Sequence, residues 1–198
     1  MGVPVSLVCE DDVHLAILEK ILRPYDIEVE SVYDRRGKYY VRDNINFYNA
    51  AAMNYHLILV DLDIDEYPCA PALLSEYLPA EVNPKLILRV AIEEAEAWLI
   101  ADHVNFSRYF SIPNRRIRRD AEQIYHPKEY LLSLIERYST DTTLSSIVPE
   151  NGIFARVGRR YNRIMTDFTL NHWNPDNARR NSPSLHRALL KINSIFHN

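Results

Sequence analysis

Short apolar runs recur along the first half of the chain, and segments with helical spacing separate them. Residues 3–9 (VPVSLVC), 56–62 (HLILVDL) and 85–91 (KLILRVA) have the composition of buried strands, whereas 27–33 (IEVESVY) alternates like a half-exposed strand. Helical spacing is clearest within 12–22, and further helices are expected at 45–53, 71–77 and 93–102. This alternation predicts an α/β fold, with a mostly parallel central sheet covered by helices on both faces.

The pattern changes after residue 102, where helical segments and polar loops follow without another strong strand. Helices are predicted at 130–137, 161–168 and 184–196. Trp98 and Trp173 lie within amphipathic segments, so we expect both to pack in a core. The chain is therefore predicted to contain an α/β core over residues 1–103 and a mainly helical C-terminal extension over 104–198, packed on that core.

Charge is distributed unevenly between these two parts. Residues 1–103 hold 8 basic and 19 acidic side chains, a net charge of −11, whereas residues 104–198 hold 15 and 8, a net charge of +7. The acidic part suits cation binding and the arginine-rich part suits a polyanion, although the two parts would also attract one another or a partner subunit. Long apolar spans and a secretory signal are both lacking, which predicts a cytoplasmic protein without membrane contact.

Acidic side chains follow the predicted central strands at the point where each strand ends. They are Glu10, Asp61 with Asp63, and Glu94 with Glu96. Because the carboxyl ends of parallel strands lie at one edge of a sheet, we expect these carboxylates to converge there. Gathered carboxylates repel one another, and a hard cation such as Mg²⁺ relieves that repulsion with oxygen ligands. The alternative is structural, since Asp63 can belong to a solvated loop and glutamates are common in a first helical turn.

Arginine is concentrated in two segments of the basic part. One contains Arg115, Arg116, Arg118 and Arg119; the other contains Arg156, Arg159, Arg160 and Arg163 around Tyr161. Arginine offers bidentate geometry to phosphate, and a nearby tyrosine can stack on an unpaired base. The second segment is therefore the predicted nucleic-acid contact, with a solvated basic face as the alternative.

A strand ending in Glu10, followed by a strand ending in Asp61-Leu62-Asp63, resembles the Toprim domain of topoisomerases, primases and overcoming-lysogenization-defect nucleases. Over nearly its whole length the chain is also similar to an uncharacterised bacterial Toprim-like family of unknown function. The segments that carry this similarity are VCEDD, GKYY, DLD, CAPAL, RVAIEEAEAWLIAD, HPKEYLLSL, VGRRYN, HWNPDNA and NSPSLHRAL.

The resemblance implies Mg²⁺, or Mn²⁺, held by Glu10, Asp61, Asp63 and Glu94, with catalytic roles for Glu96 and Lys128 as well. Lys38 in the GKYY segment joins the arginines as an expected nucleic-acid contact. The Toprim nuclease motif usually has glycine after its first glutamate and another acid four positions on, where this chain has Asp11 and His14. Asp11 is expected to cap a helix, and His14 is interpreted as an exposed helix residue rather than a metal ligand.

The leading hypothesis is a metal-dependent Toprim nuclease that cleaves DNA or RNA, in antiviral defence with an ATPase partner as the resemblance implies. The main alternative is a catalytically silent Toprim-like binding or regulatory subunit. A nucleotidyl-transfer enzyme is a third hypothesis, but no glycine-rich phosphate loop supports it. Assembly into a homo-oligomer is left open.

Overall fold

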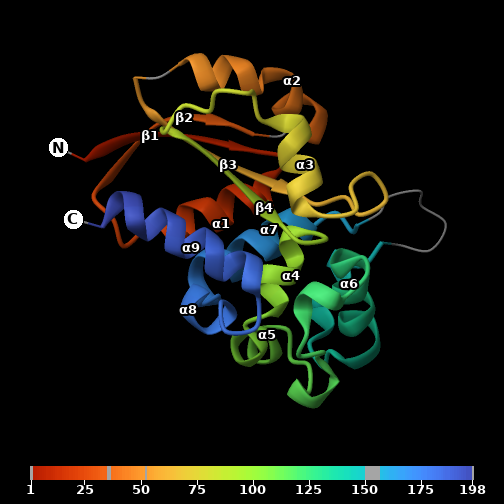
Figure 1. Ribbon diagram of the computed structural model, residues 1–198. Helices are drawn as coiled ribbons and strands as arrows, with labels where there is room; N and C mark the ends of the chain where they lie inside the picture. The colour runs from red at the N-terminus through yellow and green to blue at the C-terminus, as the bar shows by residue number, and fades with distance from the viewer. Residues whose placement is uncertain (1, 35–36, 52, 150–156, 198) are drawn as a thin grey trace. The chain divides into compact units, whose positions relative to one another are not determined.

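The computed structural model describes residues 2–34, 37–51, 53–149 and 157–197, and within it the chain forms two compact units (Figure 1). Unit 1 comprises Met1–Ile92 together with Arg187–Asn198, and unit 2 comprises Glu93–His186. The boundary between the units lies at Ile92–Glu93, whereas we expected it at residue 103. The final segment belongs to unit 1, although the sequence placed it in the C-terminal extension.

Unit 1 is built on a four-stranded sheet whose neighbouring strands are all parallel, in the order β2-β1-β3-β4. The strands are β1 (Val3–Cys9), β2 (Ile27–Tyr33), β3 (Tyr55–Asp61) and β4 (Leu86–Ala91). Cys9 pairs with Leu59 and Asp61 pairs with Ala91, so β1, β3 and β4 reach the same edge of the sheet with their carboxyl ends. The predicted α/β class and parallel sheet are confirmed.

Helices cover both faces of this sheet, as Figure 1 shows. One face carries α2 (Gly37–Ala50) and α3 (Ala70–Tyr77), and the other carries α1 (Asp12–Leu22) and the later turns of α9 (Pro183–Phe196). The α2 helix begins well before the predicted residue 45, because Val41 continues the buried stripe of Ile45 and Tyr48 at helical spacing. On the other face the ring of Phe196 packs edge-on against Tyr55, with 5.1 Å between the ring centroids.

The regular secondary structure among the described residues of unit 2 is all helical, as predicted for most of this region. Its elements are α4 (Ala95–Ile100), α5 (His103–Tyr109), α6 (Pro127–Tyr138), α7 (Tyr161–Asp167), α8 (Pro175–Ala178), the first turn of α9, the 3₁₀ turns Asn114–Arg116, Ala121–Gln123 and Thr142–Ile147, and the π-helical turn Phe168–His172. None of the helices in the part of the chain that the structure describes is long and apolar enough to cross a bilayer.

Two buried tryptophans connect segments of unit 2 by packing and hydrogen bonds. Trp98 and Trp173 are 0% and 1% exposed, which confirms their predicted core positions. The indole of Trp98 donates to Ser184 Oγ at 2.7 Å, and that of Trp173 donates to the Trp98 carbonyl at 3.1 Å. Both rings therefore bury their large apolar surface without leaving a polar N–H unsatisfied.

The sheet core should be the main source of stability in unit 1. Leu59 on β3 is fully buried, so Leu59→Ala should lower the free energy of unfolding by about 3 kcal/mol through lost burial and the cavity left behind. Leu190→Ala is the matched control, because that side chain is 51% exposed and should cost less than about 0.5 kcal/mol. Urea unfolding followed by circular dichroism measures both, and equal losses in the two variants would contradict this packing.

Candidate functional site

Glu10 and Asp61 meet at the carboxyl edge of the sheet in unit 1. Glu10 directly follows β1, and Asp61 ends the neighbouring strand β3. A side-chain oxygen of Glu10, Oε1, accepts a hydrogen bond from the Asp61 backbone N–H at 3.1 Å. The convergence of these two positions, predicted from the parallel topology, is confirmed.

The surroundings of the Glu10 carboxyl group disfavour its charged form. Burial, followed by repulsion from the Asp61 carboxylate, raises the pKa of Glu10 to about 7. Nearby His14 and the hydrogen bond from the Asp61 N–H act in the opposite direction but do not cancel this rise. The site therefore has unfavourable negative charge that a bound cation would relieve.

His14 bridges two carboxylates next to this pair. Its Nε2 lies 3.0 Å from Asp61 Oδ1, and its Nδ1 lies 2.8 Å from Asp11 Oδ1. Burial alone would lower the pKa of His14, but the two carboxylates outweigh it and hold that pKa well above the usual value. An imidazolium held between Asp11 and Asp61 follows from this arrangement.

The interpretation of His14 as an exposed helix residue is therefore wrong, since only 2% of the residue is exposed. His14 stands on the buried stripe of α1 with Ile17, Leu18 and Ile21, at spacings of three, four and seven residues. That spacing was visible in the sequence and was the signal that marks His14 as an inward-facing residue.

Asp11 caps α1, as predicted. Its Oδ1 accepts hydrogen bonds from the backbone N–H groups of Val13 at 2.9 Å and His14 at 3.0 Å. The same oxygen contacts the His14 ring, so the cap that starts the helix also fixes the orientation of the imidazole. Asp11, His14 and Asp61 are thus connected by a continuous series of polar contacts.

Asp63 belongs to the turn that follows β3 rather than to the strand itself. Its Oδ1 accepts from the Asp65 N–H at 3.2 Å, and its carbonyl accepts from the N–H groups of Glu66 and Tyr67. Because β3 ends at Asp61, strand alternation does not carry Asp63 to the same side as Asp61. Joint use of Asp61 and Asp63 on one ion therefore stays a prediction.

The carboxylate pair at the sheet edge fits one of the ways in which proteins bind Mg²⁺. Within the described residues, no group of three or more His, Cys, Asp or Glu side chains is arranged to hold a metal ion. Mg²⁺ nevertheless often takes only one or two carboxylates, with water and substrate phosphate completing its shell. Glu10 and Asp61, a partly buried pair in which burial and repulsion from Asp61 raise the pKa of Glu10, suit that mode of binding.

A second cluster lies within unit 2 and joins Glu94, Glu96, Lys128 and Tyr161. Glu96 is 1% exposed, and its Oε1 accepts from the Tyr161 hydroxyl at 2.6 Å and lies 3.2 Å from Lys128 Nζ. Glu94 Oε2 accepts from the Lys128 backbone N–H at 2.7 Å, in the first turn of α6. The structure thus brings together the three residues that the resemblance singled out in this part of the chain.

The backbone around this second cluster adopts conformations that non-glycine residues rarely take. Glu93 has φ of 65°, and His126, which precedes α6, has φ of 51°. Left-handed backbone at two positions that flank one cluster is typical of functional sites, where surrounding contacts compensate the strain. The predicted helix over 93–102 accordingly begins only at Ala95, with Glu94 as its N-cap, and it is followed by a separate helix that Asp102 caps.

Glu96 also keeps one buried oxygen without a hydrogen bond. Its Oε2 has no partner among the described residues, whereas Oε1 has two. A buried carboxylate oxygen without a donor is costly, so it marks a place where a water, an ion or a substrate proton would bind favourably. Together with the partly exposed Lys128, this makes the cluster the second candidate site of the chain.

The predicted nucleic-acid contacts are divided between the two units. Arg159, Arg160 and Arg163 are exposed around the start of α7 in unit 2, whereas Lys38 lies in the first turn of α2 in unit 1. Arg156 lies outside the described residues. Tyr161, expected to stack on a base, is 2% exposed and bonded to Glu96, so its ring has little surface to offer a base.

The five acidic residues expected at one rim fall into separate units. Glu10, Asp61 and Asp63 belong to unit 1, and Glu94 and Glu96 belong to unit 2. A scan against protein-family models, a search of curated proteins and a search of solved structures each returned no match for this chain.

Replacing Glu10 should change how stability depends on pH. Because the pKa of Glu10 is about 7 in the folded chain and 4.5 ordinarily, its favourable contribution is complete below pH 4.5 and lost as pH rises through about 7. Glu10→Gln should therefore gain about 2–3 kcal/mol on the wild type across that range. Urea unfolding at a series of pH values measures this gain, with exposed Glu19→Gln on α1 as the control. Parallel curves for the wild type and Glu10→Gln would count against a raised pKa.

The bond between Tyr161 and Glu96 can be tested by removing one hydroxyl. Tyr161→Phe should destabilise the protein by about 1–3 kcal/mol, because it takes a donor from a buried carboxylate. The control is Tyr130→Phe, whose hydroxyl bonds the Arg116 carbonyl at an exposed position and should matter less. Thermal and urea unfolding compare the pair, and a larger loss for Tyr130→Phe would refute the assignment.

Proposed function

We propose that this chain is a Toprim-like nuclease that uses Mg²⁺ or Mn²⁺ to cleave phosphodiester bonds of DNA or RNA. The observation that supports it most is the pairing of Glu10 with Asp61 at the carboxyl edge of an all-parallel sheet, with the pKa of Glu10 raised by burial and by Asp61. This edge is where open parallel sheets bind their ligands. The sequence resemblance to Toprim domains points to the same two positions.

Glu10 and Asp61 would hold the metal ion, with Asp63 as a further predicted ligand. The ion would polarise a phosphoryl oxygen and lower the pKa of a bound water. His14 serves as a positioning residue in this proposal, because its contacts with Asp61 and Asp11 restrict the orientation of the Asp61 carboxylate. Orientation of a ligand by a hydrogen-bonded neighbour is a general feature of metal sites.

The unit 2 cluster would supply positive charge for binding the nucleic acid. Lys128 is held by Glu96 at 3.2 Å and keeps 23% of its side chain exposed, so its ammonium is fixed but still accessible. In the proposal the ammonium group of Lys128 contacts a phosphate of the nucleic acid. Exposed Arg159, Arg160 and Arg163 would hold neighbouring phosphates of the nucleic acid.

A catalytically silent regulatory subunit is the second candidate function, and one observation favours it. His14 already places an imidazolium against Asp61, which partly compensates the charge that a metal ion would otherwise compensate. In that case the chain binds nucleic acid or a partner protein without cleaving it. The proposed setting for either function is a cytoplasmic antiviral defence complex with an ATPase partner, as the sequence resemblance implies.

Cleavage should require the carboxylates at the sheet edge. With Mg²⁺ or Mn²⁺ present, the purified chain should cut DNA or RNA, and Glu10→Gln or Asp61→Asn should lower the rate at least about 100-fold, because each removes a metal-binding carboxylate. Asp65→Asn, an exposed change in the turn after β3, is the matched control and should retain activity. Gel assays of labelled DNA and RNA measure the rates.

The same assays decide between the two functions. Activity that persists unchanged in both site variants would rule out the proposed mechanism. If the wild type cuts neither substrate, and if calorimetry shows that metal and nucleic acid bind independently of one another, the silent subunit is the better account.

A further inference from the structure

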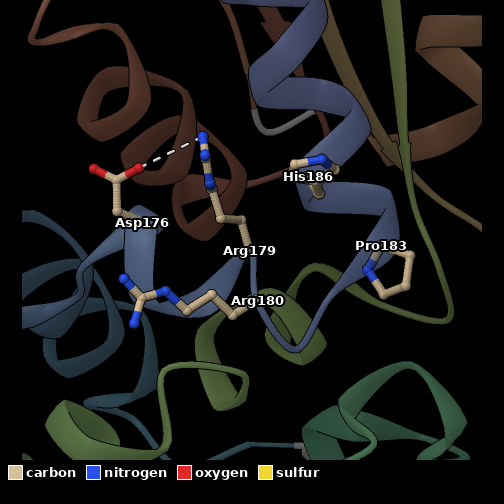
Figure 2. A pocket seen from close by; sticks show the side chains of 5 residues that line it. All are labelled: Asp176, Arg179, Arg180, Pro183 and His186. Atoms are coloured by element: carbon tan, nitrogen blue, oxygen red, sulfur yellow. Dashed lines mark ion pairs between the residues drawn. The ribbon is translucent and has the colours of Figure 1, made fainter.

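A basic pocket lies within unit 2 where α8 is followed by α9. Its volume is about 660 Å³, and its lining residues are Asp176, Arg179, Arg180, Pro183 and His186 (Figure 2). Glu10, Asp61, Glu96 and Lys128 are not among them, so this pocket is separate from both clusters described above. A volume of this size suits a small organic ligand rather than a single inorganic ion.

The charged groups of the pocket favour an anion. Two guanidinium groups and an imidazole ring stand against one carboxylate in its lining. Arg179 points toward Asp176 in Figure 2, but Nη1 and Oδ1 are 3.6 Å apart and both side chains are well exposed, at 39% and 80%. Such a solvated pair contributes little energy, so an incoming phosphate can compete for Arg179.

Arg180 is the stronger anchor for an anion. Within the described residues its guanidinium forms no hydrogen bond or ion pair, while its backbone N–H donates to the Asn177 carbonyl at 3.3 Å. Its backbone is therefore hydrogen-bonded while the residue is exposed to solvent. A planar guanidinium in this state matches two oxygens of a phosphate group.

The segment that carries the arginines is held in place at both ends. On the α8 side, Asn174 Oδ1 accepts from Asp176 N–H at 2.9 Å and Asn177 N–H at 3.2 Å. Toward α9, Asn181 Nδ2 donates to the Ala101 carbonyl at 3.0 Å, and buried Ser182 donates to Glu122 at 2.5 Å. A pocket on a fixed backbone loses little conformational entropy when it binds a ligand.

The remaining lining suits the non-phosphate part of a nucleotide. Pro183 and His186, in the first turn of α9, add ring surface to the lining, and the aliphatic stems of the arginines add apolar surface. Flat bases stack on such rings and on guanidinium planes. From this combination of charge, volume and ring surface we infer that the pocket binds a phosphate-bearing ligand of mononucleotide size.

Binding of adenosine 5′-monophosphate by the full chain tests this inference, using calorimetry in buffer with EDTA so that metal sites stay empty. Saturable binding is expected, at least about tenfold tighter than that of inorganic phosphate or adenosine alone, since each probe lacks part of the ligand. The double variant Arg179→Gln/Arg180→Gln should weaken binding at least about tenfold. The control Arg108→Gln/Arg137→Gln removes the same charge from exposed positions outside the pocket and should leave the affinity within about twofold.

Three outcomes would overturn the inference: no saturable binding of the nucleotide, equal affinity for the nucleotide and one of the two partial probes, or equal weakening in both double variants. The inference stands independently of the proposed nuclease function. Glu10→Gln should bind the nucleotide like the wild type, so loss of cleavage with retained nucleotide binding separates failure of one proposal from failure of the other.

Discussion

The carboxyl edge of the unit 1 sheet concentrates negative charge where solvent cannot fully screen it, and the surrounding structure compensates that charge. Parallel pairing of β1 and β3 places Glu10 beside Asp61, and the Asp61 carboxylate makes ionisation of Glu10 less favourable. The compensation comes from His14, delivered by the first turn of α1 and oriented by its cap, Asp11. Strand order, helix start and site electrostatics therefore depend on one another.

Unit 2 also contains an acidic side chain whose charge is compensated, but by different kinds of residue. Its buried carboxylate, Glu96, is balanced by the ammonium of Lys128 and the hydroxyl of Tyr161. The cation in unit 1 is an imidazolium whose pKa is held well above its usual value by two carboxylates, whereas the cation in unit 2 is an ammonium group. The two clusters therefore differ in the kind of cation they use, although each combines acidic side chains with a cationic one.

The fold class could be predicted from the sequence more fully than the details of either cluster. Buried strands such as β3 are apolar throughout because both of their faces are covered, and this makes them recognisable. The meeting of Glu10 and Asp61 followed from parallel topology alone. By contrast, the left-handed backbone at Glu93 and the burial of Tyr161 depend on contacts between distant segments, which composition and periodicity do not encode. The inward position of His14 was encoded, but only in its spacing from Ile17, Leu18 and Ile21.

Helix α9 begins in unit 2 and continues in unit 1. Unit 1 is therefore formed by two segments that are far apart in the sequence, with the strands in the first and the later turns of α9 in the second. During synthesis the strands emerge from the ribosome long before the turns that bring Phe196 against Tyr55. Until then, part of one sheet face is exposed to solvent. Translation order thus delays completion of the unit that holds the carboxylate pair until after the inserted helical unit has been made.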